Sequence, residues 1–158
     1  MAITTAAGIS STTVTTDQQA PLGFELVVPN GDQGEQVWVY IQAAAALAVG
    51  DIVSRAAGAG SLTLAAAAIA PVDTPTILVV GVAQHVIATN SYGFIMKKGI
   101  GEVLADTGGV TANNGLKVGN VVPGRADNIA GGDHAFAVTS ETVTATNLAT
   151  CWINCPGA

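Results

Sequence analysis

Short runs of aliphatic and β-branched residues, separated by Gly, Asn, Asp or Pro, recur along the chain from Phe24 onward. Short strands at such spacing, in a chain with 19 glycines, are typical of an all-β barrel or sandwich. We therefore predict a compact all-β domain, either a β-barrel or a sandwich. The runs expected to form strands are residues 24–28, 36–42, 51–54, 61–65, 76–87, 92–98, 101–106, 116–122, 134–139, 142–146 and 149–155.

One of these runs is apolar on both faces. In QVWVYIQ, period-two alternation places Val37, Val39 and Ile41 on one face and Trp38 and Tyr40 on the other. This strand is expected to be sandwiched or half in an interface. The alanine runs at 43–48 and 65–71 are too short to nucleate stable helices by themselves. We expect loops there, with at most one short helix.

Residues 1–22 differ in composition from the rest of the chain. They are mostly Thr, Ser, Ala and Gln, and the apolar positions Ile3, Ile9 and Val14 are isolated. So little apolar surface cannot offset the entropy of ordering the chain. The sequence predicts an extended N-terminal arm followed by a single β domain at 23–158. The arm is either a floppy tail or a segment that orders against a neighbouring molecule.

The charge pattern excludes several classes of protein. Five Lys and Arg stand against eleven Asp and Glu, a net charge of −6, and the only adjacent basic pair is Lys97-Lys98. A surface that follows phosphates needs clustered basic residues, so no nucleic-acid partner is expected. No run of about 20 apolar residues predicts a membrane span. The N-terminus lacks the basic and apolar regions of a secretory signal, and we expect no export through a membrane.

Few residues suggest chemistry. Cys151 and Cys155 are expected to be two buried or half-exposed thiols, too far apart on one strand to form a disulfide. His85 and His134 are not at metal-ligand spacing, and the acidic residues around 127–133 are too sparse for a dedicated calcium site. No catalytic or nucleotide-binding motif occurs. We predict no metal, no cofactor and no enzymatic activity.

A weak internal repeat is present. ALAVGDIVSRA at 46–56 is similar to GLKVGNVVPGRA at 115–126, and Ala-Thr-Asn occurs at both 88–90 and 145–147. Two related β units are one interpretation, and two unrelated turns between strands are the other. In either case, Gly50 and Gly119 are expected to permit turns that open valine-rich strands.

Several segments together resemble the small decoration, or cement, proteins of tailed-bacteriophage capsids. These are VWVYIQAAAALAVGDIVSRA (37–56), GVAQHVIATNSYGFIMKKGIGEVLAD (81–106), LKVGNVVPGRAD (116–127) and the closing strands to Trp152. The similarity covers roughly residues 24–155 and is a pattern of glycines and small residues. The second Gly-Asp step of the family is Gly119-Asn120 here, and the arm has no counterpart.

The resemblance implies a homotrimer on the outer surface of the virion capsid. There it would bind the major capsid protein and stabilise the contacts between its subunits. Only 10% of the residues are charged, against about 25% in an average protein, and a low charge suits large subunit contacts. The candidate interface residues are Ile3, Ile9, Val14, Trp38, Tyr40, Tyr92 and Trp152.

Other assignments remain open at this stage. The aromatic residues Trp38, Tyr40, Tyr92 and Trp152 fit either a core or an interface. A carbohydrate-binding β module on a virion or cell surface would use Trp38 and Tyr40 as an exposed platform. A small hydrolase would have to use His85 or Cys151, and no motif supports it.

Overall fold

The computed structural model describes residues 9–55, 63–131 and 133–157. Within these ranges it contains ten β-strands and two one-turn 3-10 helices, η1 (Gly31–Gln33) and η2 (Thr76–Leu78), and no α-helix. The prediction of an all-β fold is therefore confirmed. The strands are β1 (Glu25–Pro29), β2 (Glu35–Gln42), β3 (Ile52–Ser54), β4 (Ala68–Ile69), β5 (Val79–Val82), β6 (Tyr92–Leu104), β7 (Gly115–Val118), β8 (Ala126–Asn128), β9 (Ala137–Thr139) and β10 (Leu148–Asn154).

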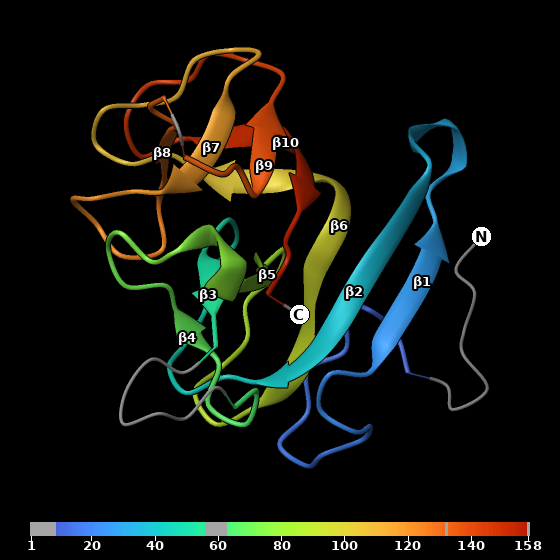
Figure 1. Cartoon of the computed structure of the whole chain (residues 1–158). Coiled ribbons are helices and arrows are strands. Elements are labelled where there is room, and N and C mark those ends of the chain that lie inside the picture. Colours follow the sequence, from blue (N-terminus) through green and yellow to red (C-terminus); the bar gives the residue numbers. More distant parts are fainter. Residues whose placement is uncertain (1–8, 56–62, 132, 158) are drawn as a thin grey trace.

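The ten described strands belong to one antiparallel sheet that folds over on itself. Its main path is β4-β3-β5-β6-β10-β9-β7-β8, and a branch runs from β6 through β2 to β1. In Figure 1, β3–β5 form one lobe, β7–β10 form a second lobe, and the β1–β2 hairpin stands to one side. Of the two predicted architectures, the sandwich fits, because the sheet does not close into a barrel.

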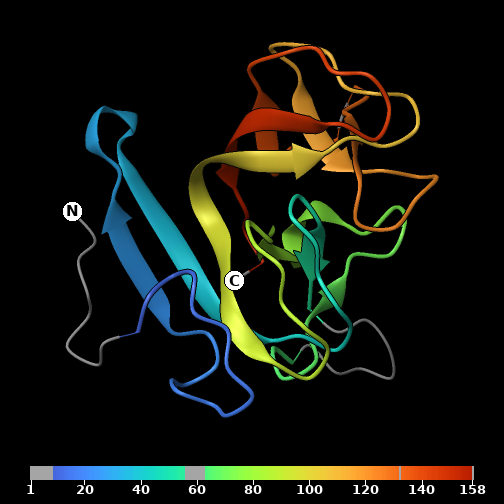
Figure 2. The same ribbon diagram turned by 180° about the vertical axis from the view of Figure 1, so that it is seen from behind.

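Strand β6 joins these parts. Its residues 92–98 pair with β2, and its residues 98–104 pair with β10. Figure 2 shows β6 bending sharply between the two partners. Gly99 lies near the bend with φ +128°, a conformation that favours glycine. The sequence predicted separate strands at 92–98 and 101–106, and the structure shows one strand bent where the prediction placed a break.

The core consists of two apolar clusters, and β2 contributes to both. Trp38 and Tyr40 belong to one cluster, together with Phe94 and Phe136. Val39 and Ile41 belong to the other, which also contains Leu47, Ile87 and Ile95. The prediction that β2 is apolar and covered on both faces is confirmed. Residues 37–41 are all buried.

Several predicted strands are shorter than expected. Residues 76–87 divide into η2, β5 and a loop that ends at an isolated bridge at Ile87. Residues 142–146 contribute only a bridge at Val143. Residues 61 and 62 lie outside the described residues, and residues 63–65 of that run are not a strand. The alanine run at 65–71 contains β4, and the run at 43–48 forms two isolated bridges, at Ala43 and Leu47, with a bend between them.

Within the described ranges, a five-residue turn motif occurs four times and opens four strands. In each copy an apolar bridge residue is followed, three positions later, by a residue with positive φ: Gly50 (86°), Asn90 (61°), Asn113 (59°) and Thr146 (61°). The next residue donates its backbone N–H to the carbonyl three positions earlier, at 3.0–3.4 Å. Positive φ at the third turn position alone is the type II pattern. The copies are residues 47–51, 87–91, 110–114 and 143–147, and they lead into β3, β6, β7 and β10.

The four copies associate in two pairs. Leu47 and Ile87 exchange both backbone hydrogen bonds, and so do Val110 and Val143. This arrangement corrects the repeat predicted from sequence, because the structural counterpart of Gly50 is Asn113 or Thr146 and not Gly119. Gly119 follows β7, opens no strand and does not have positive φ. It is needed for space, since a Cβ there would overlap the carboxylate of Asp106.

The described part of the arm packs against the β domain of the same chain. Thr15 and Tyr92 exchange two backbone hydrogen bonds, at 3.0 and 2.8 Å. The backbone N–H of Gln19 donates to the Tyr40 hydroxyl at 3.0 Å, and Ala20 is buried. Residues 1–8, including Ile3, lie outside the described residues. The division into an arm and a domain at residues 22 and 23 therefore stays a prediction.

The turn motif makes Gly50 sensitive to substitution for two reasons. We expect Gly50→Ala to lower the free energy of unfolding by about 2–4 kcal/mol, because positive φ strains alanine and the new methyl overlaps its neighbours. Its Cβ would lie 2.5 Å from Leu148 Cδ2 and 2.9 Å from the Leu104 backbone nitrogen. Gly31→Ala is the matched control: Gly31 also has positive φ (57°), but open space surrounds it.

Urea denaturation of the two variants separates these effects. Gly31→Ala should lower the free energy of unfolding by only about 1–2 kcal/mol, which is the cost of placing alanine in a backbone conformation with positive φ. Equal losses in the two variants would contradict a packing role for Gly50.

Candidate interaction surfaces

The structure buries the two cysteines. Both are free thiols, and Cys151 Sγ lies 3.3 Å from the Ala149 carbonyl oxygen, to which it donates. Burial raises the pKa of Cys151 to about 11 and also raises the pKa of Cys155. A thiol that stays protonated is a poor nucleophile. The prediction of two buried, unbridged thiols is confirmed.

His85 packs against an aromatic ring. Its imidazole lies 6.3 Å from the Trp38 ring, centroid to centroid, at an interplanar angle of 34°. Both ring nitrogens are shielded from solvent and have no hydrogen-bond partner within the described residues. Desolvation lowers the pKa of His85, because the charged imidazolium is costly to bury. The prediction of a half-buried histidine is confirmed.

No candidate metal site or membrane helix emerges from the described residues. Among them, no three His, Cys, Asp or Glu side chains gather closely enough to hold a metal ion. No described helix has the length and apolar character needed to cross a membrane.

The predicted interface residues fall into two groups. Trp38 and Tyr40 are only 5% and 1% exposed and pack within the core of this chain. Tyr92 is half-buried and stacks on Tyr40, with ring centroids 6.1 Å apart. Ile9 packs partly buried against the same cluster. Val14 and Trp152 present the most surface, at 36% and 43% exposed.

Trp152 lies in the middle of an apolar row across three strands. In the antiparallel register it stands beside Ile100 of β6 on one side and Val138 of β9 on the other. Trp152 and Val138 are 43% and 44% exposed, and Ile100 is half-buried. We call Ile100, Trp152 and Val138 the Trp152 row. A shallow hollow of about 270 Å³ lies over it, and the described residues that line this hollow carry no charge.

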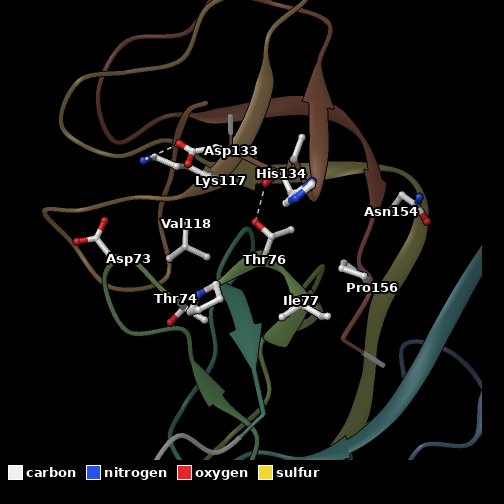
Figure 3. Close-up of a pocket in the computed structure, with 12 residues that line it drawn as sticks. Asp73, Thr74, Thr76, Ile77, Lys117, Val118, Asp133, His134, Asn154 and Pro156 are labelled. Atoms are coloured by element: carbon white, nitrogen blue, oxygen red, sulfur yellow. Dashed lines mark hydrogen bonds and ion pairs between the residues drawn. The ribbon is translucent and has the colours of Figure 1, made fainter. Parts of the chain in front are cut away.

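A larger groove separates the two lobes. It has a volume of about 770 Å³ and is lined by residues 73–77, 117–118, 133–135, Asn154 and Pro156. We call it the η2 groove (Figure 3), because η2 lies along one wall. Lys117 and Asp133 both lie on the wall opposite η2, where Lys117 Nζ is 3.1 Å from Asp133 Oδ2. This ion pair raises the pKa of Lys117 and lowers the pKa of Asp133.

The sequence indicated only part of these surfaces. Trp152 was among the aromatic residues expected in either the core or an interface, and the structure places it on the surface, 43% exposed. Ile100, Val138 and the groove residues Asp73 and Ile77 were missed. Their grouping depends on strand register and on how two lobes meet, and neither leaves a local pattern in the sequence.

The buried thiols give a direct test of the core. We expect neither Cys151 nor Cys155 to react with Ellman's reagent at pH 8 in the native protein, and both to react in guanidinium chloride. A Val86→Cys variant is the control, because Val86 is 65% exposed and a thiol there should react at once. Rapid reaction of one native thiol would contradict the burial described for it.

His85 predicts a pH dependence of stability. Because its native pKa is below the ordinary value of 6.5, the unfolded chain binds the proton more readily. The melting temperature should therefore fall as the pH drops from about 6.5 and level off below the native pKa of His85. His85→Leu should flatten this slope, whereas His134→Gln, at an exposed position, should keep it. An unchanged slope in His85→Leu would contradict the assignment.

Comparison with known proteins supports the fold. No protein-family model matches the chain, and a search of curated proteins finds no significant match. Among solved structures, the chain is similar to the N base of the head fiber protein gp8.5 of bacteriophage phi29. The TM-score is 0.53 at 13% sequence identity, and the match covers 75% of this chain and 93% of that one. This chain therefore shares its fold with the base of a phage head fiber.

Proposed function

We propose that this chain is a capsid decoration protein of a tailed bacteriophage. It binds the outer surface of the head as a homotrimer, stabilises contacts between major capsid protein subunits and has no catalytic role. The observation that carries the proposal is the fold shared with the base of a phage head fiber. The pattern of glycines and small residues in the sequence also points to a phage head protein, because it resembles the capsid decoration proteins of tailed bacteriophages.

The surface chemistry supports association with other proteins. Exposed aromatic residues flanked by aliphatic ones are typical of interface hot spots, and interface cores are depleted of charge. The Trp152 row has both properties. Many copies on one shell bind with high avidity, so each contact needs only modest affinity. A net charge of −6 fits neither a nucleic-acid partner nor a surface rich in anionic lipid.

The carbohydrate-binding alternative loses its platform. It depended on Trp38 and Tyr40 as exposed rings in a groove, and both rings are buried in the core. Of the four aromatic residues named as candidates for a core or an interface, Trp152 is the exposed one, and its neighbours in the row are aliphatic.

The Trp152 row provides a test of self-association. We expect light scattering after size exclusion to give the wild-type chain a mass of about 47 kDa, three times the 15.6 kDa of one chain. Trp152→Ser should reduce the mass toward that of one chain, because it removes the largest apolar side chain of the row. Val121→Ser is the matched control, since Val121 is 59% exposed and lies outside the row.

Two results would contradict this assignment. A single-chain mass for the wild type would contradict a trimer in solution. A three-chain mass for Trp152→Ser would exclude the row as the contact between copies.

A further inference from the structure

We propose that the η2 groove binds an extended peptide segment of another protein, with a Lys or Arg side chain flanked by small aliphatic residues. The groove is separate from the Trp152 row, so the inference goes beyond the proposed trimer. Its volume, about 770 Å³, is within the range of sites that hold ligands.

The groove is held open by contacts between its walls. The Thr76 hydroxyl of η2 donates to the His134 carbonyl oxygen on the opposite wall at 2.7 Å (Figure 3). The backbone N–H of Asp73 donates to the Gly119 carbonyl oxygen at 3.0 Å. The backbone N–H of Gly157 donates to the Val79 carbonyl oxygen at 2.8 Å. These bonds connect the first lobe to the second lobe and to the C-terminal segment. A groove formed in advance costs a ligand little ordering entropy.

Aliphatic side chains form part of the lining of the groove. Ile77 is 70% exposed, the highest value among the large apolar residues of the described chain. Val118, which is buried, and Pro75 and Pro156 also line the groove. Small aliphatic side chains of a bound segment would cover Ile77 and remove this surface from water.

Carboxylates give the groove a negative balance. Lys117 is its only Lys or Arg among the described lining residues, and Asp133 already neutralises it. Asp73 lies near enough to Lys117 to act on it electrostatically, as does Asp127. Within the described residues, the Asp73 carboxylate and the Asn154 carboxamide make no hydrogen bond or ion pair. A basic side chain can pair with Asp73, and a peptide amide can bond to Asn154.

The occupant is expected to come from another protein. The arm at residues 1–22 contains no Lys or Arg, so the arm of a second copy cannot supply the basic side chain. A glycan is disfavoured because no Trp, Tyr or Phe is among the described residues of the groove, and the unpaired carboxylate favours a cation.

The test is an NMR titration of the full-length ¹⁵N-labelled protein with two pentapeptides. These are acetyl-Ala-Val-Lys-Val-Ala-amide and the same peptide with Glu in place of Lys. We expect the Lys peptide to shift amide signals of residues 73–77 and 117–118 and to bind about fivefold more tightly than the Glu peptide. A single exposed charge pair supports a difference of that size.

Variants separate charge from apolar contact. Asp73→Asn should lower the affinity for the Lys peptide to the affinity that the wild type has for the Glu peptide. In the wild type, 0.5 M NaCl should remove the difference in affinity between the two peptides. Ile77→Ser should lower the affinity for both peptides, because both would cover Ile77. Val86→Ser is the matched control, because Val86 is 65% exposed and lies outside the groove.

Several outcomes would overturn the inference. They are equal binding of the two peptides, shifts confined to the Trp152 row, and no binding of the Lys peptide. Shifts in the groove with maltotriose alone would assign it to a glycan instead. No capsid is present in this experiment, so its failure does not affect the proposal of head decoration, and a failure of head binding does not affect the groove.

Discussion

Strand β6 determines the arrangement of the molecule, because two different strands pair with its two halves. Its first half holds β2 and the hairpin to β1, and its second half holds β10 and the lobe beyond it. The bend near Gly99 turns one antiparallel sheet into a sandwich-like body. Both apolar clusters contain side chains of β6, with Phe94 and Met96 in one and Ile95 in the other. A loss of pairing at the bend would therefore affect both clusters.

The repeated turn motif fixes where strands begin. Each copy reverses the chain after an apolar bridge residue, and the copies pair through reciprocal backbone hydrogen bonds. Isolated short strands are marginally stable, so these junctions help to explain how strands of three or four residues persist. Gly, Asn and Thr occupy the positive-φ position, and glycine is the only one of them without conformational cost. The overlap found at Gly50 adds a packing requirement to that position.

Much of the fold followed from local patterns in the sequence. The all-β class, the doubly covered β2 and the buried thiols all depend on alternation or composition. The internal repeat was detected, but it was aligned wrongly, with Gly50 opposite Gly119. Val-Gly-Asp and Val-Gly-Asn are similar in sequence, whereas their glycines have different structural roles. Gly50 occupies a positive-φ turn, and Gly119 makes room for the Asp106 carboxylate, which accepts backbone N–H groups at 121 and 122. The Trp152 row and the η2 groove depend on contacts between distant segments and could not be predicted locally.

The two proposals assign the two surfaces different partners: under them, the uncharged row would contact other copies of the chain and the groove would bind a segment of another protein. Co-sedimentation of the purified protein with heads of its own phage, stripped of their native copies, tests the central claim most directly. The account predicts saturable binding in multiples of three chains and a higher melting temperature for the decorated shell. Absence of binding to stripped heads, with the protein still folded, would contradict it.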